Sequence, residues 1–136
     1  MSLSSEEHLQ AHVATMLRAY LPDGIWWSAS LSGIRLTPHL QKKAKGQGLN
    51  RGAPDLSFVM PSGVTRYIEL KAGKNGLTDE QKALQATLGG RMAVCRSWPE
   101  VRDQLAAWMA PYGLRFLTDT ESFRRENAKP SKGIAA

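Results

Sequence analysis

Hydrophobic residues at the start of the chain recur with the spacing of one face of a helix. Apolar side chains stand at Leu9, Val13, Met16, Leu17 and Tyr20. This pattern predicts an amphipathic helix over residues 5–20. Ser4 is a favourable N-cap, because its hydroxyl can accept a backbone N–H from the first turn. A Pro-Asp-Gly turn at 22–24 ends the helix.

The middle of the chain alternates short apolar runs with turn residues. We expect strands over 25–29, 55–60, 64–71 and 92–96, and helices near 38–45, over 78–88 and from Ser97 onward. A tight Pro-Ser-Gly turn joins the second and third strands, which must therefore be antiparallel. A helix separates the third and fourth strands, which favours parallel pairing.

These elements predict a single α/β domain, with a mixed β-sheet flanked by helices. We place this domain over residues 1–118. Residues 119–136 are polar and basic, and we expect them to form a flexible tail. Neither a membrane span nor a signal peptide is visible, and Cys95 is the only cysteine. A lone cysteine excludes a disulfide framework and suits a cytoplasmic protein.

Charge is distributed unevenly along the chain. The 136 residues include 18 Lys and Arg against 12 Asp and Glu, a net charge of +6. Residues 24–54 contain no acid at all. Their cations are Arg35, Lys42, Lys43, Lys45 and Arg51. The stretch suits contact with the phosphates of a nucleic acid, although a solvated surface loop would have a similar composition. Lys74, in the loop after the third strand, is a further candidate for phosphate contact.

Two acids and a lysine flank the predicted hairpin. Asp55 lies seven residues before Ser62, the centre of the turn, and Glu69 lies seven residues after it. The two carboxylates should therefore face each other on neighbouring strands. Lys71 is two residues beyond Glu69 and shares its face of the sheet.

Carboxylates placed this closely repel each other unless a cation lies between them. Oxygen ligands favour Mg²⁺ or Mn²⁺, and such an ion activates water and polarises phosphoryl oxygens. The residues thus suit metal-assisted cleavage of a phosphodiester. The alternative is a cross-strand salt bridge between the lysine and the acids.

Three motifs together resemble the PD-(D/E)xK nuclease superfamily, and more narrowly the VRR-NUC family. They are Gly-Ala-Pro-Asp at 52–55, Glu-Leu-Lys at 69–71 and Leu-Thr-Asp-Glu-Gln at 77–81. The resemblance implies a restriction-endonuclease-like core and Mg²⁺-dependent cleavage of DNA, with Mn²⁺ as a substitute.

The resemblance also assigns roles to individual residues. Asp55 and Glu69 would be metal ligands, together with the peptide carbonyl of Leu70, and Lys71 would be the catalytic lysine. Gln81 matches a glutamine that lies near the active site of the family. Its alternative role is structural, because Thr78 and Gln81 also form a capping-box pattern.

The family carries one more acid on its first helix, for which Glu6 and Glu7 are the candidates. Glu7 stands three residues after Ser4 and suits a capping box, whereas Glu6 shares the inward stripe of Leu9 and Val13. We therefore choose Glu6 as a metal ligand. The alternative is that both acids simply favour the helix N-terminus through its dipole.

The resemblance favours a phage or bacterial endonuclease of the host cytoplasm, acting in DNA repair or recombination. Its partner would be DNA, with Holliday junctions a leading candidate, and a homodimer would supply two active sites. The apolar surfaces of the first or last helix could form the dimer interface. Alternatives are a monomeric nicking or flap nuclease and a module that binds nucleic acid without cleaving it. Trp26 and Trp27 could stack on bases, but adjacent strand residues face opposite sides, so at least one should be core.

Overall fold

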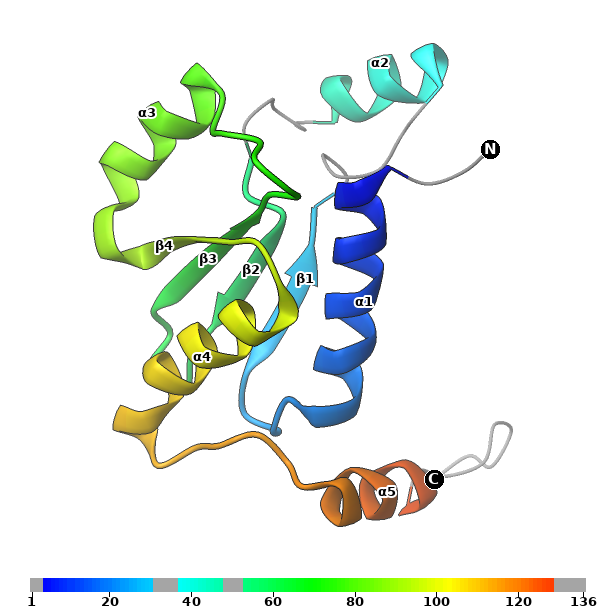
Figure 1. The fold of residues 1–136 in the computed structure, drawn as a ribbon, viewed down its shortest axis with the longest axis vertical. Helices are drawn as coiled ribbons and strands as arrows, with labels where there is room; N and C mark the ends of the chain where they lie inside the picture. The colour runs from blue at the N-terminus through cyan, green and yellow to red at the C-terminus, as the bar shows by residue number, and fades with distance from the viewer. Residues whose placement is uncertain (1–3, 31–36, 48–52, 129–136) are drawn as a thin grey trace.

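Over residues 5–109, the helices and strands follow one another in the order that the sequence predicts (Figure 1). The structure is a computed structural model and describes residues 4–30, 37–47 and 53–128. The elements are α1 (Ser5–Tyr20), β1 (Trp26–Ala29), α2 (Pro38–Gly46), β2 (Leu56–Val59), β3 (Thr65–Leu70), α3 (Asp79–Leu88), β4 (Met92–Cys95), α4 (Trp98–Met109) and α5 (Asp119–Ala128). Single 3₁₀ turns follow α3 and α4, at Gly89–Arg91 and Ala110–Tyr112.

The four strands form one mixed sheet in the order β1-β2-β3-β4. The pairs β1–β2 and β2–β3 are antiparallel, whereas β3 and β4 are parallel. The antiparallel hairpin and the parallel pair joined through α3 are both confirmed. The chain is thus a mixed α/β fold with helices flanking a four-stranded sheet.

A tight turn sets the register of the β2–β3 hairpin. The Met60 N–H donates to the Val64 carbonyl at 2.8 Å, and the Gly63 N–H donates to the Met60 carbonyl at the same distance. Gly63 has a φ of 87°, a conformation that costs glycine little and other residues more. With this turn, Leu56 pairs with Ile68.

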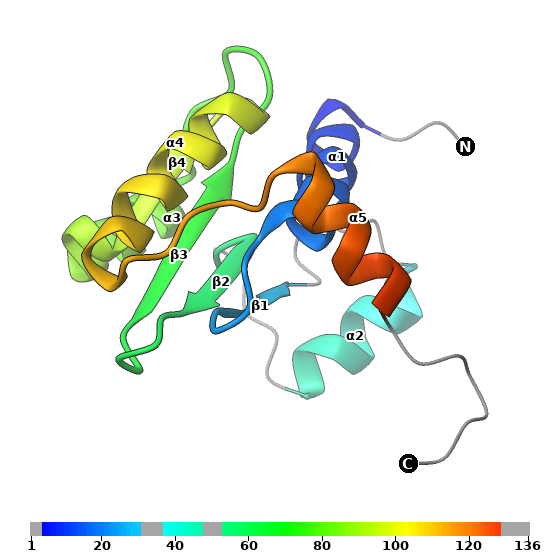
Figure 2. The same ribbon diagram turned by 90° about the horizontal axis from the view of Figure 1, so that it is seen from below.

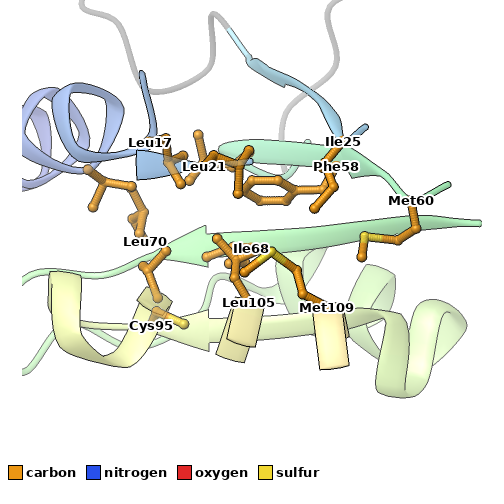
Figure 3. Close-up of a cluster of buried hydrophobic side chains, with 13 residues drawn as sticks. Leu17, Leu21, Ile25, Phe58, Met60, Ile68, Leu70, Cys95, Leu105 and Met109 are labelled. Carbon is orange, nitrogen blue, oxygen red and sulfur yellow. The ribbon is translucent and has the colours of Figure 1, made fainter. Parts of the chain in front are cut away.

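One face of the sheet carries the hydrophobic core. Helices α1 and α4 cover this face, and the apolar side chains of β2 and β3 meet them there (Figures 2 and 3). The central members are Val13, Leu17, Leu56, Phe58, Ile68, Leu70, Val101, Leu105 and Met109. The apolar surfaces of α1 and α4 therefore lie inside the protomer. The dimer interface suggested for these helices stays a prediction, and their buried residues pack in the core of the protomer.

The segment after α4 differs from the expected flexible tail. Residues 119–128 form α5, and the rest of this segment, residues 129–136, lies outside the described residues. The Glu121 N–H donates to the Thr118 hydroxyl at 3.2 Å, and the Thr118 N–H donates to the Glu121 carboxylate at 3.0 Å. This reciprocal pair satisfies two backbone donors at the start of the helix. The Thr-x-x-Glu spacing was the signal in the sequence that could have predicted it.

Arg125 ties α5 to the end of α1. Its guanidinium donates to the carbonyls of Leu21 at 2.6 Å, Arg18 at 2.9 Å and Ala19 at 3.1 Å. The last carbonyls of a helix have no partner within the helix, so a cation there supplies both hydrogen bonds and a favourable charge. Within the described residues, no helix is long and apolar enough to cross a membrane.

Candidate active site at the end of the hairpin

Asp55, Glu69 and Lys71 lie at one end of the β2–β3 hairpin. Asp55 immediately precedes β2, Glu69 is the second-last residue of β3, and Lys71 follows that strand. The observed pairing of Leu56 with Ile68 places Asp55 opposite Glu69. The register predicted from the turn is therefore confirmed. The starts of α1 and α3 lie at this same end of the sheet (Figure 1).

All three side chains are buried. Asp55 is 8% exposed, Glu69 is 2% exposed and Lys71 is 6% exposed. Among residues 4–30, 37–47 and 53–128 they are the buried polar or charged residues. Charged groups are rarely buried without a partner, because they lose their hydration. Their convergence at one position is difficult to explain as an exposed surface salt bridge.

Each carboxylate accepts a backbone hydrogen bond from the neighbouring strand. The Leu70 N–H donates to Asp55 Oδ2 at 2.7 Å, and the Asp55 N–H donates to Glu69 Oε2 at 3.2 Å. These bonds orient both carboxylates toward the same point between β2 and β3. The arrangement follows from the strand register, because opposed residues exchange backbone contacts across the pair.

Burial and mutual repulsion make the pair reluctant to ionise fully. Burial first, and then the negative charge of the neighbouring Asp55, together raise the pKa of Glu69 to about 8. Burial also raises the pKa of Asp55, while the Leu70 N–H opposes that rise. Lys71 lowers the pKa of both acids through its charge, but does not cancel the effect of burial. An added cation would allow both carboxylates to ionise.

Gln81 caps helix α3 and also contacts the candidate site. Its side-chain oxygen accepts the Thr78 N–H at 2.9 Å, and its own N–H donates to the Thr78 hydroxyl at 3.2 Å. These bonds complete a capping box at the start of α3. The side-chain NH₂ of Gln81 also donates to Glu69 Oε1. The cap thus fixes the amide while its nitrogen holds a carboxylate of the site.

Glu6 lies near the pair without joining it. Its charge raises the pKa of Asp55, and its Oε1 accepts a hydrogen bond from the Asn75 side chain at 3.2 Å. In the described part of the chain, no three His, Cys, Asp or Glu side chains are close enough to hold one metal ion. Sequence reasoning missed Asn75, which links the loop after β3 to α1. The Glu7 N–H donates to Ser4 at 3.1 Å, which confirms the N-cap.

Four of the predicted phosphate-binding residues are exposed. Lys42, Lys43 and Lys45 are exposed on α2, and Lys74 is exposed between β3 and α3. In Figure 1, α2 lies at the same end of the sheet as the starts of α1 and α3. Arg35 and Arg51 lie outside the described residues.

Comparisons with known proteins do not assign the chain to a family. No family model matches the chain, and no curated protein or solved structure shows significant similarity to it. The case for this site therefore rests on its residues and their geometry.

Proposed function

We propose that the protein is a Mg²⁺-dependent DNA endonuclease with a restriction-endonuclease-like core, of the PD-(D/E)xK type and the VRR-NUC family. The observation that carries the proposal is the buried cluster of Asp55, Glu69 and Lys71 at the end of a hairpin. A structural salt bridge gains nothing from two mutually repelling buried acids beside one lysine. A catalytic site does gain, because perturbed groups of this kind gather where chemistry occurs.

The donor set fits a hard divalent cation. Asp55 and Glu69 supply carboxylate oxygens, and burial, the main cause of their raised pKa values, leaves them with little hydration that a cation would have to displace. The peptide carbonyl of Leu70 and the nearby Glu6 are further oxygen donors of the kind that Mg²⁺ and Mn²⁺ accept. When bound, the metal would polarise a phosphoryl oxygen and lower the pKa of a water molecule.

The remaining residues act on charge and orientation. Lys71 would hold the attacking water or stabilise the negative charge that develops on the phosphate, because its ammonium is buried where electrostatic effects are strong. Gln81 would fix the orientation of the Glu69 carboxylate. Water would attack the phosphodiester directly, with no covalent intermediate on the protein.

The exposed cations support DNA as the substrate. Lys42, Lys43 and Lys45 on α2, together with Lys74, would contact the phosphate backbone, and such contacts are sensitive to salt. We further propose that the enzyme selects branched DNA such as Holliday junctions, in repair or recombination. A homodimer in the cytoplasm of a bacterial or phage-infected cell would cut both strands.

A panel of DNA structures tests this function. Four-way junctions, flaps, nicked duplexes and linear duplexes are incubated with the protein in Mg²⁺, and the products are resolved on denaturing gels. The parent should cut at least one of them, and Lys71→Met should lower the cleavage rate at least about a hundredfold. Lys82→Met, a matched change at an exposed position of α3, should cut like the parent.

Three outcomes would redirect the proposal. If Lys71→Met cuts as fast as Lys82→Met, the site is misassigned. If the parent binds DNA but cuts none of the panel in Mg²⁺ or Mn²⁺, the protein is a binding module. Preference for flaps by a protein of monomeric mass would replace the junction-resolving dimer with a flap nuclease.

A further inference from the structure

The face of the sheet opposite the core carries an exposed tryptophan. Side chains alternate along a strand, so the register assigns six residues of β1, β2 and β3 to the same face as Asp55 and Glu69. This open sheet face consists of Trp26, Ser28, Ser57, Val59, Thr65 and Tyr67. Helices α1 and α4 lie on the other side of the sheet (Figure 2).

Trp26 and its neighbour Trp27 have opposite environments. Trp27 packs against the core cluster and lies under the guanidinium of Arg18, at 5.7 Å from the ring centroid. Trp26 is 62% exposed, one of three large apolar side chains in the described ranges that face solvent. An indole exposed to this extent is available for contact with a partner.

The charge around the open sheet face favours a polyanion over another apolar surface. None of its six residues is acidic, and helix α2, which carries the exposed Lys42, Lys43 and Lys45, lies at the candidate-site end of the sheet (Figure 1). An exposed aromatic ring on one side of the candidate site and a set of cations on the other is a combination that suits single-stranded nucleic acid. The ring stacks on a base, and the cations follow the phosphates.

Trp26 lies on strand β1, which leads to the candidate site. The Ser30 N–H donates to the Asp55 carbonyl at 2.9 Å, and Trp26 is four residues before Ser30 on the same chain. At about 3.3 Å per residue, the Cα of Trp26 lies about 13 Å along the strand from the level of Asp55. That span corresponds to about four nucleotides at the spacing of one strand of B-DNA.

We propose that Trp26 stacks on an unpaired base of the DNA substrate, a few nucleotides from the phosphate held at Asp55 and Glu69. The occupant of the open sheet face is therefore a single strand, such as a flap or the splayed arm of a branch point. This inference rests on the proposed function only in taking DNA as the ligand. It adds a binding site for an unpaired base to a site that otherwise contacts only the backbone.

Binding in EDTA tests the inference apart from cleavage. Fluorescence anisotropy of labelled oligothymidylate and of a fully paired duplex is measured at one fixed salt concentration. Trp26→Ala should weaken binding to the single strand about 5- to 100-fold, the effect of losing one stacked base. Its affinity for duplex should change less than about twofold. Trp26→Phe should restore most of the loss, because phenylalanine also stacks.

Phe123→Ala is the matched control. Phe123 is 69% exposed on α5, which lies at the far end of the sheet from α2 (Figure 1), so both DNAs should bind this variant as they bind the parent. The inference fails if Trp26→Ala binds the single strand as the parent does, or if single strand and duplex weaken equally. It also fails if Trp26→Ala lowers the solution mass of the protein, which would assign the face to a second copy.

The two proposals fail separately. Trp26-dependent binding by a protein that never cuts DNA in Mg²⁺ would support the base-stacking site and refute the nuclease. If the protein cuts DNA, but the parent and Trp26→Ala bind single-stranded DNA equally well, the stacking site alone would be refuted.

Discussion

The stability of the metal-free protein should fall as the pH rises, because Glu69 is buried beside Asp55. Burial raises the pKa of Glu69 from its usual 4.5 to about 8. Between these two values the folded protein keeps a proton that the unfolded chain has lost. The folded state therefore loses stability through this window, and the full penalty is present above pH 8. Glu69→Gln should remove this dependence.

The magnitude follows from the shift. One pKa unit corresponds to about 1.4 kcal/mol, so an isolated group shifted this far would cost about 4–5 kcal/mol once ionised. Asp55 shares the proton, since the two carboxylates are coupled, and we therefore expect a loss of about 2–4 kcal/mol between pH 5 and pH 8.5. For a domain of this size the loss corresponds to a melting temperature lower by about 6–12 °C.

Urea unfolding followed by circular dichroism, in EDTA at both pH values, measures this loss. A glutamine at position 69 keeps the shape of the side chain and stays neutral at every pH. Between the two pH values, the free energy of unfolding of the parent should fall. Any fall in Glu69→Gln should be smaller than the fall in the parent by at least about 2 kcal/mol. Glu80→Gln removes an exposed acid from the first turn of α3 and should behave like the parent.

Mg²⁺ provides the second arm of the same experiment. The ion binds ionised carboxylates, so it should stabilise the parent at pH 8.5 by about 2–3 kcal/mol at a hundredfold excess over its dissociation constant, and much less at pH 5. Equal pH dependence in parent and Glu69→Gln would refute the reasoning. So would Mg²⁺ stabilisation that is unchanged in Glu69→Gln.

Three further predictions concern the supports of the site and the fold. Gln81→Ala should destabilise the protein by about 1 kcal/mol through loss of the capping box and also slow cleavage, whereas Thr78→Ala should lose similar stability with a smaller effect on the rate. Arg125→Ala should release α5 from α1, detected as faster proteolysis within α5 while the melting of the sheet changes little. Leu105→Ala, at a fully buried position of α4, should cost about 2–5 kcal/mol in urea unfolding.

Local patterns predicted the hairpin well. The turn at Pro61, Ser62 and Gly63 has a strong sequence signature, and the strand period of two then determines which side chains share a face. The opposition of Asp55 and Glu69 followed from this arithmetic alone, and the observed register agrees with it. Helix α1 could be predicted equally well, because its N-cap and its apolar stripe are local features of the sequence.

Contacts between distant segments were not predictable in this way. The bond from Asn75 to Glu6 joins residues that are far apart in sequence, and no period or spacing connects them. Arg125 likewise reaches carbonyls more than a hundred positions earlier, which turns a polar segment into a docked helix. In the sequence, capping of α3 and contact with the candidate site looked like alternatives for Gln81. In the structure, its side-chain oxygen accepts the Thr78 N–H of the cap, and its side-chain nitrogen donates to Glu69.

Cleavage by two matched asparagine variants tests the central claim most directly. Asp55→Asn removes the charge of a buried carboxylate in the site, and Asp79→Asn makes the same change in the first turn of α3. Single-turnover cleavage is measured on the best DNA of the panel, in Mg²⁺ and in EDTA. We predict that parent and Asp79→Asn cut at similar rates in Mg²⁺ and not in EDTA, and that Asp55→Asn is slower by at least about a hundredfold. Equal rates for the two variants, or cleavage that persists in EDTA, would contradict the account.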